Sequence, residues 1–151
     1  MLDEYEINSS TLAIIPINDN SSKVYEEETE YVVNKNVHKI IDFNCKFYGS
    51  SYAGRCEGTK YLLGIKSKYP IIIEESRNLI FFPTSSTRKL DNAWISLNKI
   101  KNYHAKEGGT VIHFENESKV EIPISYYSIE NQVCRATMLK AKLYELKSEK
   151  K

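Results

Sequence analysis

The clearest structural signal lies in residues 94–124, which read WISLNKIKNYHAKEGGTVIHFENESKVEIPI. The segment at 119–124 alternates apolar with polar residues, and this period of two predicts a strand with one buried face. The Gly-Gly pair at 108–109 and the Glu-Asn-Glu-Ser run at 115–118 predict turns. We therefore expect an antiparallel meander over this stretch.

Short apolar runs that precede the meander predict further strands. The chain holds eleven Tyr, five Phe and one Trp, and aromatic residues favour strands. Residues 23–33, with the acidic run EEETE, are expected to form a polar edge strand or a loop. Strands are expected at residues 11–15, 37–43, 61–65, 71–73 and 79–82.

The pattern changes to a helical period near the C-terminus. Ile129, Val133, Ala136 and Leu143 fall on one helical face, and the period predicts a helix over 129–146. Short antiparallel strands followed by one amphipathic helix predict a mainly β, α+β fold. We expect a small, partly open antiparallel β-barrel of pleckstrin-homology-like type, an analogy that concerns the fold pattern only.

Length and composition favour one domain over residues 1–151. Hydrophobic residues make up 41% and charged residues 27%, values that exclude a disordered chain. No run approaches the roughly 18 apolar residues that a membrane span needs, and the start MLDEYEINSS is acidic where a signal peptide would be basic. We expect a cytoplasmic protein without a membrane partner.

Charge is distributed unevenly along the chain. Residues 1–44 hold three Lys and nine Asp or Glu, whereas residues 45–151 hold eighteen Lys or Arg and eleven Asp or Glu. The basic part indicates either a polyanionic partner or an ordinary solvated surface. The acidic part could contact RNA polymerase, but we favour a role in solvation and self-association.

No motif predicts catalysis, so we expect no enzymatic activity, no cofactor and no metal site. Phosphate-loop and dinucleotide-binding motifs are absent, and the three cysteines form no CxxC pair. His38, His104 and His113 lie in separate predicted strands, as structural or surface histidines do. A hydrolase or transferase that uses Cys45 or Cys56 stays open as an alternative, because a nucleophile meets its partners only in the fold.

Two segments have the composition of anion-binding loops. Residues 47–60, FYGSSYAGRCEGTK, combine glycines and serines with Tyr52, Arg55 and Lys60. Residues 83–89, PTSSTRK, place hydroxyl groups beside two basic side chains. These segments are either ordinary surface turns or binding loops for an anion or a nucleic acid.

The first two turns of the predicted helix carry a polar group made of Asn131, Gln132 and Arg135. This group could hold the segment 49–55 by hydrogen bonds to backbone carbonyls, or it could touch a nucleic acid directly. We favour bracing by Asn131 and Gln132, because their amide groups supply donors for unpaired backbone carbonyls.

Three segments resemble the signature blocks of the competence transcription factor family, ComK. They are CKFYGSSYAGR (45–55), FFPTSSTRKLDNAWIS (81–96) and PISYYSIENQVCRAT (123–137), in the order and spacing of that family. The similarity extends from the YEIN…LAIIP opening (5–16) to the terminal helix. One departure is Tyr48, where FFGSS is expected in place of FYGSS.

The resemblance implies a DNA-binding transcriptional activator of DNA-uptake genes, associated with the nucleoid, that reads paired AT-rich boxes through the minor groove as a homo-oligomer. Two boxes need two readers, joined through an open sheet edge or a helix face with Leu139 and Leu146. With one predicted helix, no helix-turn-helix is expected. The expected DNA contacts are Ser50, Ser51, Tyr52, Arg55, Lys60, Ser85, Ser86, Arg88, Lys89 and Arg135, of which Arg55 and Arg88 would enter the groove and the serines would bind phosphates.

The alternative from a different class is a non-enzymatic module that binds a small anion or a phosphorylated ligand through the same two segments. Such a module would bind the small anion saturably and would bind DNA weakly, without preference for sequence.

Overall fold

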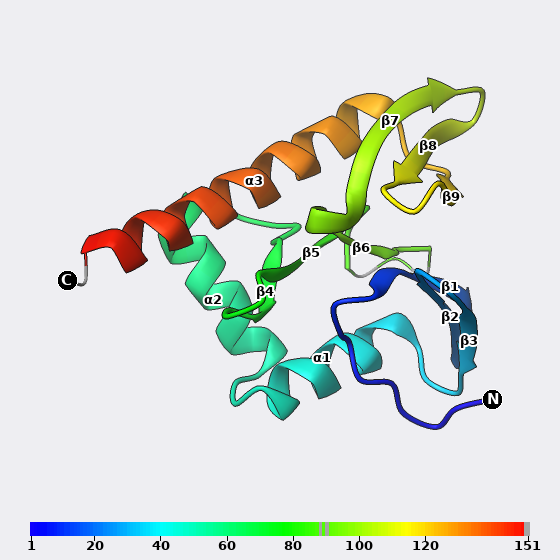
Figure 1. Cartoon of the computed structure of the whole chain (residues 1–151), viewed down its shortest axis with the longest axis horizontal. Helices are drawn as coiled ribbons and strands as arrows, with labels where there is room; N and C mark the ends of the chain where they lie inside the picture. The colour runs from blue at the N-terminus through cyan, green and yellow to red at the C-terminus, as the bar shows by residue number, and fades with distance from the viewer. Residues whose placement is uncertain (88, 90, 150–151) are drawn as a thin grey trace.

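The computed structural model describes residues 1–87, 89 and 91–149 and contains two antiparallel sheets and three α-helices (Figure 1). The larger sheet has six strands in the spatial order β3-β2-β1-β6-β5-β4. Its strands are β1 (Thr11–Asn18), β2 (Ser21–Glu26), β3 (Glu30–Val33), β4 (Ile71–Glu74), β5 (Leu79–Pro83) and β6 (Trp94–Ser96).

The smaller sheet is the meander predicted from the sequence. A short 3-10 helix, η1 (Leu97–Lys99), leads from β6 into β7 (Ile100–Lys106), β8 (Gly109–Phe114) and β9 (Lys119–Ile122), which pair in chain order. Gly108 adopts a φ of 83°, which a side chain rarely tolerates, and a Cβ on Gly109 would collide with the carbonyl of Ile122. Glycine is therefore required at both positions of this turn.

Two helices replace elements that we expected to be strands or loops. Residues 37–43, predicted as a strand, begin α1 (Val37–Phe47), and residues 47–60, predicted as a loop, belong largely to α2 (Tyr52–Leu63). The prediction of a strand at 61–65 was also wrong, because α2 extends to Leu63 and ends at Gly64 with a φ of 69°. The four residues 48–51 join α1 to α2, so a two-helix unit is present where none was expected.

The helical spacing of the buried residues in α1 explains why residues 37–43 form a helix and not the predicted strand. Its buried residues Val37, Ile40, Ile41, Asn44 and Cys45 follow the spacing of one helical face. The side chain of Asn36 accepts a hydrogen bond from the backbone N–H of Lys39 and caps the first turn.

The large sheet is covered on both faces. Ile14 lies opposite Val24 and Trp94, and these residues face the core beneath α1. Ala13 lies opposite Ile95, which pairs with Phe82, and these face the second core, formed with the small sheet and the C-terminal helix α3 (Tyr126–Glu149). Figure 1 shows the resulting layers, with α1 on one side of the large sheet and α3 and the small sheet on the other.

The predicted α+β class, with mainly antiparallel strands and a C-terminal helix, is confirmed. The expected partly open barrel is not formed, because the strands lie in two separate sheets and the larger sheet ends in β3 on one side and β4 on the other. Within the described residues, no helix is long and apolar enough to cross a membrane.

Candidate nucleic-acid interface

The turn between α1 and α2 positions the first pair of predicted contact residues. Ser51 caps α2, and its hydroxyl accepts a hydrogen bond from the N–H of Gly54 at 2.9 Å. A Cβ built on Gly54 would lie 2.9 Å from the Ser50 hydroxyl and 3.2 Å from that of Ser51. Both hydroxyl groups thus lie over the first turn of α2.

Tyr52 ties the start of α2 to the rest of the fold. Its backbone N–H donates to Asp42 Oδ1 at 3.0 Å, and its ring packs edge-on against Trp94 and His38 at 6.1 and 4.9 Å between centroids. Burial raises the pKa of the Tyr52 hydroxyl, which also interacts with Thr87. The helix start and the residue-87 segment are therefore in contact.

The two basic residues of α2 differ in their surroundings. Lys60 is exposed in the last turn, whereas Arg55 is half-buried, and its Nε is buried with no hydrogen-bond partner among the described residues. Burial raises the pKa of the neighbouring Cys45 thiol to about 12, although the positive charge of Arg55 opposes this shift. Cys45 is therefore a protonated core residue at neutral pH, and the raised pKa of half-buried Cys56 likewise disfavours a thiolate nucleophile.

The second predicted loop follows β5 and is fastened by side chains. Asn92 Oδ1 accepts a hydrogen bond from the Ser85 N–H at 3.1 Å, and Thr84 Oγ1 accepts one from the Ala93 N–H at 3.0 Å. Ser85 is buried, and its hydroxyl has no hydrogen-bond partner among the described residues, whereas Lys89 is exposed. Ser86 is half-buried, and Arg88 lies outside the described residues.

The segment 83–89 borders a hollow of about 170 Å³. Thr87 and Lys89 form one wall, and the start of α1 and the end of β1 form the other. Because Thr87 also meets Tyr52, the segment after β5 spans the starts of both α1 and α2. Segments more than 30 residues apart in sequence thus share one surface.

The polar group on α3 braces the backbone, but at a different place from the one predicted. Gln132 Nε2 donates to the carbonyls of Lys68 at 3.0 Å and Pro83 at 2.8 Å. Arg135 Nη1 donates to the Ser67 carbonyl at 3.0 Å. The segment 49–55, which we expected this group to hold, has no hydrogen bond to α3 among the described contacts.

Asn131 does not take part in this bracing. It is exposed and makes no side-chain hydrogen bond to another described residue. The segment 66–69 that Gln132 and Arg135 hold was not predicted as a contact segment, because residues 61–65 before it were predicted to be a strand. Gly64 and Pro70, which flank this segment, are the turn signals that could have revealed it.

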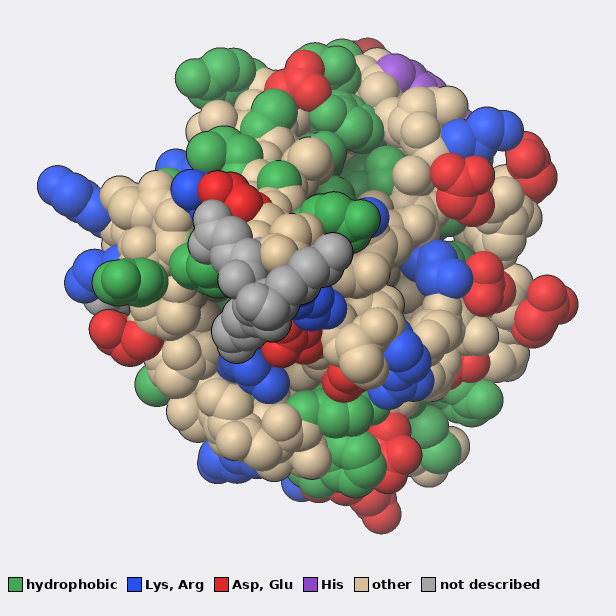
Figure 2. Space-filling model, turned by 60° about the vertical axis from the view of Figure 1, so that its left-hand side comes forward, with side chains coloured by type: hydrophobic (Ala, Val, Ile, Leu, Met, Phe, Trp, Pro, Cys, Tyr) green, Lys and Arg blue, Asp and Glu red, His purple; other side chains and the backbone are tan. Residues whose placement is uncertain are grey.

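Charge is mixed on the face that Figure 2 shows, which is the side at the left of Figure 1. Lysine and arginine side chains are interspersed there with aspartate and glutamate, and hydrophobic side chains are exposed in separate patches. The described side chains visible on this face therefore form no continuous basic patch.

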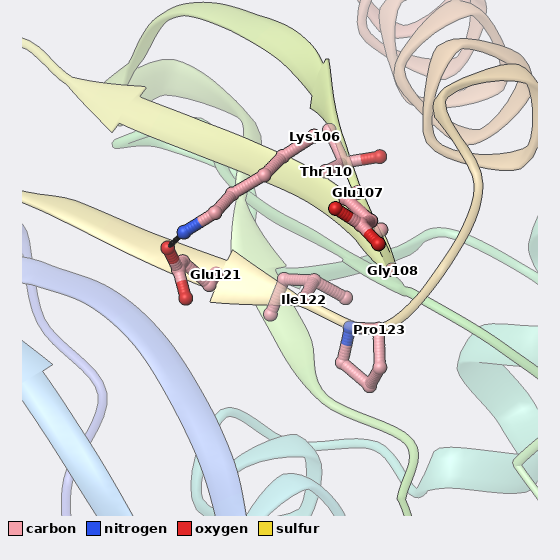
Figure 3. Close-up of a pocket in the computed structure, with 8 residues that line it drawn as sticks. Lys106, Glu107, Gly108, Thr110, Glu121, Ile122 and Pro123 are labelled. Carbon is pink, nitrogen blue, oxygen red and sulfur yellow. Dashed lines mark hydrogen bonds and ion pairs between the residues drawn. The ribbon is translucent and has the colours of Figure 1, made fainter.

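A further hollow of about 230 Å³ lies where the β7–β8 turn approaches the end of β9 (Figure 3). Lys106 forms an ion pair with Glu121 across it, and Glu107 also lines it. The two carboxylates disfavour an anionic ligand, so this hollow is a poor candidate for a phosphate site.

The two histidines of the small sheet lie on separate strands, as predicted, and their rings are in contact. His104 and His113 stand on the paired strands β7 and β8, with His113 Nε2 at 3.2 Å from His104 Nδ1. No third potential ligand joins them, since the described part of the chain has no group of three or more His, Cys, Asp or Glu that could hold a metal ion.

Comparison with known proteins gives two findings. The family model described as "ComK protein" matches residues 2–148. The chain is 38% identical over 148 residues to the competence transcription factor of Bacillus subtilis (strain 168), covering 95% of this chain and 77% of that protein. No solved structure matches.

Proposed function

The chain belongs to the ComK family, and on this premise we propose that it is a competence transcription factor that binds promoter DNA and activates DNA-uptake genes. The observation that carries the proposal is the family match over nearly the whole chain. The absence of a recognised catalytic motif and the protonated state of Cys45 favour this role over the thiol-enzyme alternative.

We place the DNA-reading surface where the start of α2 meets the segment after β5. This surface offers the hydroxyl groups of Ser50, Ser51 and Ser86 for phosphates and Lys89 for charge neutralisation, and Lys60 adds a charge at the other end of α2. Buried Ser85 would support the loop from inside. Half-buried Arg55 adds positive charge beside this surface.

The surface of α2 favours minor-groove and backbone contact over major-groove reading. A recognition helix reads base edges with long polar side chains. In the first two turns of α2, the exposed residues are instead mostly small: Ala53, Gly54 and Gly58 beside Glu57. Lys60 and Tyr61 are exposed only near the end of the helix. AT-rich minor grooves are narrow and strongly negative, so a few inserted cations can select them without a full base code.

We propose that the protein binds DNA as a homo-oligomer, because two separated AT-rich boxes need two DNA-binding subunits. Of the helix face suggested for this contact, Leu139 is buried and only Leu146 is exposed, so that face cannot serve as predicted. A strand edge is the remaining route, and β4, which ends the large sheet, is the better candidate there because Leu2 already bonds to the outer edge of β3. Light scattering is expected to detect a dimer or larger species on a double-box probe, and a monomer alone would contradict oligomeric reading.

A mobility-shift titration tests the proposed function. It compares an AT-rich double-box probe with a GC-rich probe of equal length at two salt concentrations. We expect tighter binding to the AT-rich probe and weaker binding at higher salt, because Lys and Arg release counterions when they neutralise phosphates. Equal affinity for both probes, or affinity independent of salt, would contradict the proposal.

A further inference from the structure

A hollow of about 420 Å³ lies between the connection from α2 to β4 and the segment after β5. Two lysines and four hydroxyl-bearing residues line it, and no acidic residue lines it within the described chain; the lining is Lys66, Ser67, Lys68, Tyr69, Ser86 and Thr87. We call it the Lys66–Thr87 hollow. Its composition suits an anion with several acceptor oxygens.

One wall of this hollow is held in an unusual backbone conformation. Lys68 adopts a φ of 51°, in the left-handed region that residues other than glycine rarely occupy. Such a conformation persists only when surrounding structure holds it, and it gathers at functional sites. The Gln132 bond to the Lys68 carbonyl and the Arg135 bond to the Ser67 carbonyl supply that support from α3.

Gln132 also fixes the opposite wall. Its side chain is 2% exposed, and both hydrogens of its amide are used, one toward Lys68 and one toward the Pro83 carbonyl at the end of β5. Its remaining oxygen accepts from Arg135 Nη1 at 3.3 Å. A single buried side chain thus sets the spacing between the lysine-bearing wall and the segment that carries Thr87.

We propose that the Lys66–Thr87 hollow binds a phosphate group of the DNA backbone, with Lys66 and Lys68 supplying charge. The hydroxyl groups of Ser67 and Thr87 donate hydrogen bonds to the phosphate oxygens. Gln132 and Arg135 are positioning residues that hold the lysine wall. This inference rests on the proposed DNA binding and deepens it, because it adds a contact segment outside the predicted loops.

The two lysines are tested by fluorescence-anisotropy titration of the full chain on AT-rich and GC-rich duplexes over a range of salt concentrations. Lys66→Ala and Lys68→Ala are each expected to make the slope of log affinity against log salt shallower by about one unit. Binding weakens equally on both probes, because a phosphate contact carries no sequence information. Lys119→Ala, an exposed lysine of β9, removes the same charge elsewhere and keeps the wild-type slope.

The outcomes separate this inference from the function on which it rests. If both lysine variants keep the wild-type slope of log affinity against log salt and the preference for the AT-rich probe, the phosphate site would be wrong and the proposed DNA binding would still hold. Loss of AT preference in the wild-type chain would overturn the proposed function as well. Inorganic phosphate is added as a competitor, and saturable phosphate binding that both lysine variants abolish, without any change in DNA affinity, would assign the hollow to a small phosphorylated ligand instead.

The positioning role of Arg135 is tested by a double-mutant cycle with Lys68. Arg135→Met removes the bonds to Ser67 and Gln132 and keeps a similar length. If Arg135 acts through the lysine wall, the loss of affinity in the double variant Arg135→Met/Lys68→Ala is smaller than the sum of the single losses. Additive losses would mean that Arg135 contacts DNA independently, and the positioning role would be wrong.

Discussion

The helices α2 and α3 are fixed to the fold in different ways. In α3, Ile129, Ala136, Leu139 and Leu143 are buried at helical spacing against the second core. In α2, only Thr59 is buried, and its hydroxyl donates to the Pro70 carbonyl at 2.6 Å. α3 is therefore held along its length by fully buried residues. In contrast, α2 is held by its caps, by the Thr59 bond and by partly buried residues near its two ends, Tyr52 and Cys56 at the start and Leu62 and Leu63 at the end.

The difference indicates that α3 stabilises the fold, whereas α2 presents side chains to a ligand. A helix that buries a full stripe loses stability when any residue of that stripe is truncated. A helix held at its ends can change its exposed residues at little cost, so it is suited to carry ligand contacts. We therefore expect changes on α2 to alter DNA binding more than stability, and changes under α3 to do the reverse.

The largest effect is expected at Trp94, on which the ring of Tyr52 packs. Its side chain is 1% exposed, so Trp94→Ala should lower the free energy of unfolding by roughly 3–5 kcal/mol. Chemical denaturation of both proteins measures the difference. A loss below about 1 kcal/mol would mean that α2 does not depend on this sheet contact.

The next largest effect is expected at Gln132. Gln132→Leu keeps the volume but leaves the carbonyls of Lys68 and Pro83 without their donor, which should cost about 1–3 kcal/mol. Asn131→Ala, one residue away and exposed, is the matched control and should stay within about 0.5 kcal/mol of wild type. Equal losses in the two variants, measured by thermal melts, would remove the distinction between bracing and surface positions on α3.

A smaller effect is expected at the cap of α2. Ser51→Ala removes the acceptor for the Gly54 N–H and should cost about 1 kcal/mol. Ser51→Asp keeps an acceptor at the same place and should restore most of that stability. If Ser51→Asp melts like Ser51→Ala, capping is not what holds the start of this helix.

The smallest effect concerns the pH dependence of the same helix start. The Tyr52 backbone N–H, and after it the Lys46 side chain, lower the pKa of Asp42 below its usual value. A carboxyl with a lowered folded pKa stabilises the fold above its unfolded pKa of about 3.9 and loses that contribution as the pH falls through the folded value. The stability difference between wild type and Asp42→Asn, measured by urea unfolding, should therefore be present at pH 7 and shrink below pH of about 4. A difference that is constant with pH would exclude this role for Asp42.

The sequence predicted the regions whose signals are local. The alternation at 119–124 and the glycines at 108–109 were enough for the small sheet, and the helical period was enough for α3. The segment 37–43 was assigned wrongly because its partial alternation was given more weight than the helical spacing of Val37, Ile40 and Ile41.

Other features depend on contacts that no local pattern contains. Gln132 meets Lys68 across 64 positions of sequence, and only the packing of α3 against β5 determines which carbonyls its amide can reach. The contact of Tyr52 with Thr87 likewise depends on how α2 lies over the large sheet. The residue types of the candidate surface could be predicted, whereas their partners could not.

The central claim, reading of AT-rich DNA through the minor groove, is tested most directly with a probe in which inosine·cytosine pairs replace the A·T pairs of the boxes. Inosine lacks the minor-groove amino group of guanine but presents the major-groove edge of a G·C pair. In an anisotropy titration against A·T and G·C probes of equal length, we expect the inosine probe to bind nearly as tightly as the A·T probe. Affinity as weak as that of the G·C probe would contradict minor-groove reading.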